Sequence, residues 1–197
     1  IMTYAFAKLS GLSESQILGS GTALDTARLR CRLSQHYGVS EKNIHAYVFG
    51  EHGDTSFVPW SRAFVAGATL QAVRDEFDKI VHEDQKDLPP LDREEVLEYV
   101  HTSGSTVIAK KGATFYAVAV SVCRLCSLLL AASDTIVSVS TMLHGEYGIE
   151  DVCLSTMASI GPNGVKRIVR VPLTEEETEK LHASANALKD VIAQIDL

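Results

Sequence analysis

The order of local patterns along the chain constrains its fold most strongly. Helical patterns dominate the earlier part, whereas strands joined by tight turns gather in the later part. A capping box of Thr174 and Glu177 predicts a last helix that reaches about Ile195. Segregated helices and hairpins indicate an α+β domain, with helices packed on antiparallel hairpins, rather than a parallel βαβ sheet. The other helices are expected at residues 1–9, 22–37, 70–79, 93–109 and 113–133, and the strands at 44–49, 135–143, 152–160 and 165–171.

Glycine and proline mark the expected ends of these elements. Gly38 is placed to end the second helix, and the break between the two long later helices is expected at Gly104 or Gly112. The Pro-Asn-Gly sequence at 162–164 predicts a tight turn between two strands. The charged, proline-ended segment 82–90 is expected to be a surface connection.

Size and charge narrow the class of protein. A chain of 197 residues can form one large domain or two small ones around a buried core. Acidic residues outnumber basic residues 25 to 18, which gives a net charge of -7. Because proteins that bind nucleic acid usually carry the opposite balance, this composition argues against that class.

The cysteines and the longest apolar run indicate a soluble protein of a reducing cytoplasm. The sequence has four cysteines, no Asn-X-Ser/Thr acceptor and no secretion signal at its start. Cys123 and Cys126 form a C-x-x-C pattern, but no second pair completes a zinc site, so core packing is favoured over redox or metal chemistry. The apolar run 117–132 is too short to span a bilayer and contains Arg124, which predicts a buried helix.

Two short motifs carry residues suited to proton transfer and anion binding. In Gly-Glu-His-Gly-Asp-Thr at 50–55, two glycines let the backbone turn tightly around His52, whose imidazole exchanges protons near neutral pH. In Leu-Asp-Thr-Ala-Arg at 24–28, Asp25 and Arg28 share a helix face. Arg28 can hold a carboxylate with two nitrogens, and Asp25 can fix the tautomer of a histidine. A surface salt bridge and a structural loop histidine remain the alternatives.

These motifs together resemble the bacterial-type L-lactate dehydrogenase family. Gly-Ser-Gly-Thr at 19–22 precedes the Asp-Arg motif, Trp-Ser at 60–61 follows the histidine motif, and Lys-Gly-Ala-Thr stands at 111–114. The resemblance covers essentially the whole chain. It implies the fold of a lactate/malate dehydrogenase C-terminal domain, which is the family's substrate-binding, catalytic domain.

The resemblance also implies a reaction and a role for each site residue. The family interconverts L-lactate and pyruvate with NAD as the hydride carrier, in glycolysis and pyruvate fermentation to lactate, as cytoplasmic tetramers. His52 would exchange the proton, Asp25 would be its partner, Arg28 would grip the carboxylate and Thr114 would line the substrate pocket. No metal is implied.

Arg30 and His45 resemble residues that bind the effector fructose 1,6-bisphosphate in the allosteric bacterial members of the family. Arg28 and Arg30 lie about 200° apart around a helix, so one can serve the substrate while the other faces elsewhere. A solvated arginine and a structural strand histidine are the alternative.

The family's N-terminal nucleotide-binding domain is expected to be absent from residues 1–197. Leu24 stands where the third glycine of G-x-G-x-x-G would follow Gly19 and Gly21, so no residue is assigned to cofactor binding. The isolated chain is therefore expected to be inactive, because NAD would be bound mostly by the other domain. Ile1, Met2 and Phe6 are expected to expose apolar surface.

Three other functions remain open, and the motifs argue against two classes of hydrolase. Branched 2-hydroxyacid and malate dehydrogenases are close relatives, although Glu51 favours lactate over malate. A non-catalytic oligomerisation module would keep the fold without the reaction. A metal hydrolase built on Glu51, His52 and Asp54 lacks a convincing third ligand. A serine hydrolase lacks the Gly-X-Ser-X-Gly motif.

Overall fold

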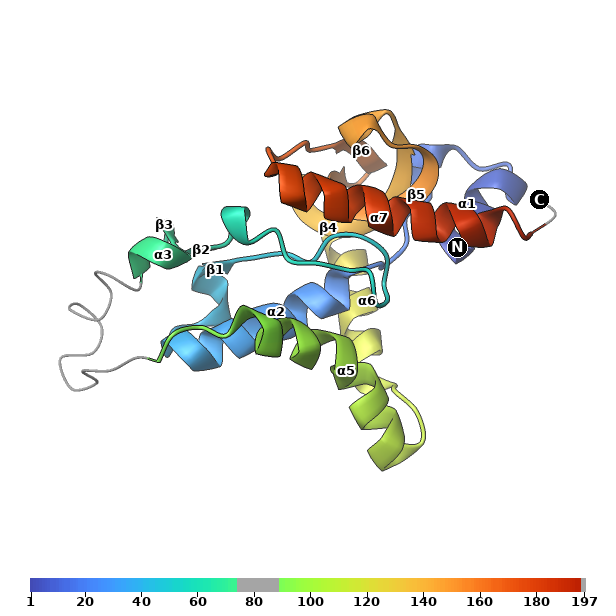
Figure 1. Ribbon diagram of the computed structural model, residues 1–197. Helices are drawn as coiled ribbons and strands as arrows, with labels where there is room; N and C mark the ends of the chain where they lie inside the picture. The colour runs from blue at the N-terminus through green and yellow to red at the C-terminus, as the bar shows by residue number, and fades with distance from the viewer. Residues whose placement is uncertain (74–88, 196–197) are drawn as a thin grey trace.

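The computed structural model describes residues 1–73 and 89–195. They form two antiparallel three-stranded sheets with helices packed around them, which confirms the expected α+β class. The small sheet has the order β1-β2-β3 and the large sheet the order β4-β5-β6 (Figure 1). The strands are β1 (Ile44–His45), β2 (Phe64–Val65), β3 (Ala68–Thr69), β4 (Thr135–His144), β5 (Glu150–Gly161) and β6 (Gly164–Ile168). The helices are α1 (Met2–Leu9), α2 (Ala23–Tyr37), α3 (Leu70–Ala72), α5 (Arg93–Lys111), α6 (Tyr116–Leu129) and α7 (Glu175–Ile192).

The large sheet is packed between helices. On one face, Leu181 and Leu188 of α7 join a core cluster with Leu143, Val152 and Leu154 of β4 and β5. Because side chains alternate between the two faces of a strand, the neighbours of Leu143, Val152 and Leu154 point to the opposite face of the sheet. There Tyr4 of α1 packs on Met142 and Cys153. In Figure 1, α7 runs across the sheet.

A second core holds α2 and α5 together beneath the large sheet (Figure 1). Leu29 and Leu33 of α2 are fully buried and pack with Val96 and Val100 of α5. Helix α2 ends at Gly38, which takes the left-handed conformation that glycine adopts without steric cost (φ 63°). The helix and its end are as predicted.

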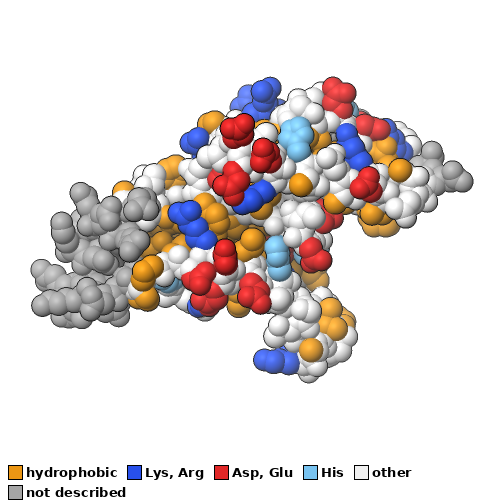
Figure 2. Space-filling model, in the orientation of Figure 1, with side chains coloured by type: hydrophobic (Ala, Val, Ile, Leu, Met, Phe, Trp, Pro, Cys, Tyr) orange, Lys and Arg blue, Asp and Glu red, His pale blue; other side chains and the backbone are white. Residues whose placement is uncertain are grey.

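The later helices also break where expected, but α6 is not the buried helix that its composition predicts. Gly112, with φ 79°, ends α5, which resolves the choice between Gly104 and Gly112. Within α6, only Leu125 is buried, while both Cys123 and Cys126 are free and exposed. The prediction of core cysteines was therefore wrong. One face of α6 packs on the large sheet. The rest of the helix lies at the surface of a projecting helical hairpin (Figure 2).

The small sheet differs most from the prediction. The expected strand at 44–49 is two residues long, and β2 and β3 were not predicted, because so short a run shows no alternating pattern. Of the helix expected at 70–79, Leu70–Ala72 is α-helix and the part beyond residue 73 lies outside the described residues. Residues 82–88 of the predicted surface connection also lie outside them.

The hairpin turn and the helix cap of the later part are as predicted, although the last strand ends at Ile168 and not at residue 171. The turn at 162–164 joins β5 to β6, and a Cβ at Gly164 would lie 1.9 Å from the backbone oxygen of Ser15. Thr174 and Glu177 form the expected capping box at the start of α7. Within residues 1–73 and 89–195, no helix has the length and apolar character needed to cross a membrane.

Candidate functional site

Asp25 stands at the centre of a three-residue cluster. It lies in the first turn of α2, and its side chain is 5% exposed. Its Oδ2 is 2.6 Å from Nδ1 of His52, and its Oδ1 accepts a hydrogen bond from Arg28 at 3.2 Å. One carboxylate thus bonds both the imidazole and the guanidinium that the sequence singled out. We call Asp25, Arg28 and His52 the carboxylate cluster.

The start of α2 is fixed by two threonines that bracket one residue of the neighbouring segment. Thr22 Oγ1 donates to the carbonyl oxygen of Val48 at 2.6 Å, and Thr26 Oγ1 accepts from the Val48 N–H at 3.0 Å. All these groups are buried. Because a buried polar group is costly to leave unpaired, these bonds hold α2, and hence Asp25, against the chain that leads to His52.

The loop 50–55 that carries His52 is held from the large sheet and from α7. Gly50 exchanges two backbone hydrogen bonds of 3.0 Å with Ser155 of β5. The buried Ser184 hydroxyl of α7 accepts from the Glu51 N–H at 2.8 Å and lies 2.9 Å from the Thr55 hydroxyl. Thr55 Oγ1 donates in turn to Glu51 Oε1 at 2.7 Å.

A third attachment joins the same loop region to α5. His101 Nε2 lies 2.8 Å from the hydroxyl of the buried Ser56. Neither Ser184 nor His101 was predicted from the sequence, because each is far from residues 50–56 in the chain and forms no motif with them. The structure therefore adds two residues that position the loop.

His52 is held at one nitrogen and open at the other. Its side chain is 61% exposed, and Nδ1 faces Asp25. The hydrogen bond to Asp25 raises the pKa of His52 above its usual range, against the opposing effect of burial. Because Asp25 accepts from Nδ1, the Nε2 atom is the one left to exchange a proton with a ligand.

Arg28 is placed to hold an anion beside His52. Its side chain is 15% exposed, and only one terminal nitrogen bonds Asp25. A guanidinium carries five N–H donors, so this single bond leaves donors free for a carboxylate. The cluster therefore combines a proton-exchanging imidazole with a cation that can orient an acid.

The other proposed site residues lie outside this cluster. Thr114 is in the connection between α5 and α6, and no contact in the described part of the chain joins it to Asp25, Arg28 or His52. Arg30 donates to the carbonyl oxygen of Ala46 at 3.0 Å and stacks 4.6 Å from the ring centre of Tyr47. The exposed His45 precedes Ala46 directly.

The described residues form neither a dinucleotide cradle around Gly19 and Gly21 nor a cluster of metal ligands. Gly19 pairs with Ser140 of β4, and a Cβ at Gly21 would lie 2.2 Å from Ser155 Oγ, so both glycines serve close packing on the sheet. Both sheets are antiparallel, whereas a dinucleotide cradle follows a parallel strand. Among the described residues, no three His, Cys, Asp or Glu side chains are grouped to hold a metal ion.

The fold and the carboxylate cluster describe a domain with a proton-exchanging histidine beside an arginine that can bind an acid, and a comparison with protein families identifies its class. Residues 22–196 match the lactate/malate dehydrogenase, alpha/beta C-terminal domain. The chain belongs to this family, as its motifs predicted.

Individual relatives and solved structures support this family assignment. The chain is 41% identical over 197 residues to an L-lactate dehydrogenase of Acetivibrio thermocellus, covering 100% of this chain and 60% of that protein. It is 41% identical over 195 residues to L-lactate dehydrogenase 1 of Enterococcus faecalis, covering 98% and 56%. An L-lactate dehydrogenase structure from Clostridium thermocellum matches with a TM-score of 0.87 and 38% identity, over 100% of this chain and 62% of that one. The chain thus spans about 60% of the length of these relatives.

Replacing Ser184 by alanine should loosen the loop 50–55. It removes a buried acceptor of the Glu51 N–H, so we expect a loss of about 1–3 kcal/mol in the free energy of unfolding and faster exchange of the Glu51 amide hydrogen. Urea unfolding and hydrogen exchange measure these effects. Ser127→Ala is the matched control, because the exposed Ser127 hydroxyl bonds the carbonyl oxygen of Cys123 in its own helix. Unchanged Glu51 exchange in Ser184→Ala would contradict the role.

Proposed function

We propose that this chain is the substrate-binding and proton-transfer domain of an NAD-dependent L-lactate dehydrogenase. The observation that carries the proposal is the single carboxylate of Asp25 bonded to both His52 and Arg28. The family match and the names of the relatives support it. Thr114, which lies outside the cluster, is proposed to line the substrate pocket once the enzyme is complete.

The reaction follows from the free atoms of the cluster. The carboxylate of L-lactate binds the free N–H groups of Arg28, which places its hydroxyl at Nε2 of His52. His52 accepts the hydroxyl proton as the C–H hydride leaves, which gives pyruvate, and Asp25 stabilises the resulting imidazolium through Nδ1–H. In the reverse direction, protonated His52 donates to the carbonyl oxygen. NAD, which a separate nucleotide-binding domain would hold, would supply the hydride acceptor and donor for this reaction.

The assembly proposed for the whole enzyme requires contact surfaces on this chain. Met2, Phe6 and Leu9 of α1 are exposed, as are Tyr116 and Val120 of α6. Exposed apolar patches of this kind are usual where a second domain or subunit packs. We propose that a nucleotide-binding domain and further copies cover them in a cytoplasmic tetramer.

Reconstitution tests the function directly. The chain is co-expressed with the nucleotide-binding domain of the Acetivibrio thermocellus relative, and pyruvate-dependent NADH oxidation is measured on the copurified pair. We expect activity with the pair, none with either part alone, and none with His52→Gln. A copurified pair that fails to reduce pyruvate would support the non-catalytic oligomerisation module. Faster reduction of a branched 2-oxo acid or of oxaloacetate would support the two related dehydrogenases.

The effector proposal has its own test in that assay. Arg30 donates to the carbonyl oxygen of the buried Ala46, which directly follows the exposed His45. If the two residues bind the effector, fructose 1,6-bisphosphate is expected to lower the KM for pyruvate by about tenfold, within the usual range of allosteric coupling. The Arg30→Gln and His45→Gln variants should lose this effect, while Arg32→Gln, which breaks a surface pair with Glu95, should keep it. An effect that survives in the first two variants would refute the assignment.

A further inference from the structure

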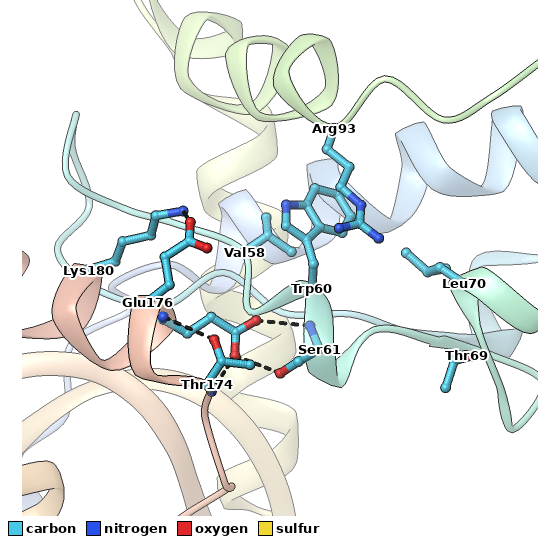
Figure 3. A pocket seen from close by; sticks show the side chains of 10 residues that line it. Val58, Trp60, Ser61, Thr69, Leu70, Arg93, Thr174, Glu176 and Lys180 are labelled. Atoms are coloured by element: carbon cyan, nitrogen blue, oxygen red, sulfur yellow. Dashed lines mark hydrogen bonds and ion pairs between the residues drawn. The ribbon is translucent and has the colours of Figure 1, made fainter.

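A cavity lies apart from the carboxylate cluster. It occupies about 460 Å³ between the 3-10 turn η3 (Trp60–Arg62), the start of α5 and the start of α7 (Figure 3). Volumes of about 300–1,000 Å³ are usual for sites that bind small molecules. Its apolar wall contains Val58, Trp60 and Leu70, and none of Asp25, Arg28 or His52 lines it.

The acidic side chains of this cavity are already engaged. The Glu177 carboxylate accepts hydrogen bonds from the Ser61 N–H at 2.9 Å, the Ser61 hydroxyl at 2.6 Å and the Thr174 N–H at 3.0 Å. Glu176 pairs with Lys180 at 2.6 Å. Lys180 therefore offsets the charge of Glu176, whereas Glu177 keeps its charge and turns its oxygens toward Ser61 and Thr174.

Arg93 is the basic group left without an acidic partner. Its guanidinium lies 5.4 Å from the ring centre of Trp60, and the two side chains stack at the cavity in Figure 3. In the described part of the chain, no carboxylate lies within ion-pair distance of it. Stacking uses the flat face of a guanidinium, so its N–H edge stays free to bind two oxygens of one anion.

We propose that this cavity binds a small organic anion. Its carboxylate or phosphate group would accept two hydrogen bonds from Arg93, and a flat apolar body would lie against Trp60, Val58 and Leu70. Lys180 also lines the cavity, where it pairs with Glu176. Such a ligand is a second small molecule for this domain, separate from the 2-hydroxy acid of the proposed reaction, and its binding needs no nucleotide-binding domain.

Trp60 makes the proposal testable, because it is the only tryptophan of the chain. Its fluorescence is titrated with phenyl phosphate and with benzoate, and circular dichroism confirms that each variant is folded. We expect a saturable change with at least one of these anions. Arg93→Gln should weaken that binding by about tenfold or more, since a two-pronged charged hydrogen bond is lost.

Two controls distinguish specific binding in this cavity from nonspecific binding of the anion or of its ring. Arg167→Gln removes the same charge from an exposed position on β6 and should leave the affinity unchanged. Phenol, which has the ring without the charge, should bind at least tenfold more weakly than the anion. The proposal is overturned if neither anion gives a saturable signal, if phenol binds equally well, or if Arg93→Gln and a folded Arg167→Gln behave alike.

Discussion

Replacing Asp25 by asparagine is expected to lower the turnover of the reconstituted enzyme by about 10²- to 10⁴-fold, the range that general acid–base catalysis contributes. The carboxylate lies 2.6 Å from His52 Nδ1 and is almost fully buried, so it favours the charged imidazole strongly. An amide keeps the shape but loses the charge, and it can present a donor to Nδ1. Both changes oppose proton transfer at Nε2.

The same variant should change the titration of His52, which is measured by NMR on this chain alone. The folded pKa of His52 is raised above its unfolded value, mainly by the hydrogen bond to Asp25. The stabilisation linked to this shift is therefore present below the unfolded pKa of about 6.5 and is lost as pH rises through the folded pKa. In Asp25→Asn the pKa should fall and this pH dependence of the free energy of unfolding should disappear.

Asp134→Asn is the matched control for both measurements. Asp134 bonds Lys166 at 2.7 Å on the surface, so its replacement should alter neither turnover nor the His52 pKa. If Asp25→Asn kept a high His52 pKa and full turnover, Asp25 would not be the partner of the proton-transfer group. A variant that fails to reconstitute is still informative, because the pKa is read on the isolated chain.

Elements defined by local chemistry were predictable from the sequence. The end of α2 at Gly38, the break at Gly112 and the capping box of α7 each depend on residues within one turn of each other. The long strands β4 and β5 were also predicted, because ten or more residues are enough for a pattern. The two-residue strands of the small sheet exist only through their pairing, which a local reading cannot detect.

Burial was harder to predict than secondary structure. The apolar composition of α6 identified a helix correctly, but composition does not say which surface covers it, and Cys123 and Cys126 are exposed in this chain. The site shows the same division. Asp25, Arg28 and His52 stood out in motifs, whereas Ser184 and His101 act on the loop 50–56 from distant helices without any local signal.

Replacing Arg28 by glutamine is expected to reduce kcat/KM for pyruvate by about 10²- to 10³-fold. Loss of one partner of a buried charge pair costs about 2–5 kcal/mol, and each 1.4 kcal/mol is tenfold. Arg28→Lys keeps the charge but cannot form two parallel hydrogen bonds, so a smaller loss of about tenfold is expected. Arg32→Gln, which alters a surface pair on the same helix, should leave kcat/KM unchanged.

Two further measurements identify what Arg28 does. Methyl pyruvate lacks the carboxylate, so the preference of the enzyme for pyruvate over this ester should largely vanish in Arg28→Gln; a preference that persisted would mean that another group binds the carboxylate. The charge of Arg28 also lowers the pKa of His52, so its removal should raise that pKa, whereas Asp25→Asn should lower it. Opposite shifts are expected only if both side chains act on one imidazole, since residues that merely support the fold would not move its titration in opposite directions.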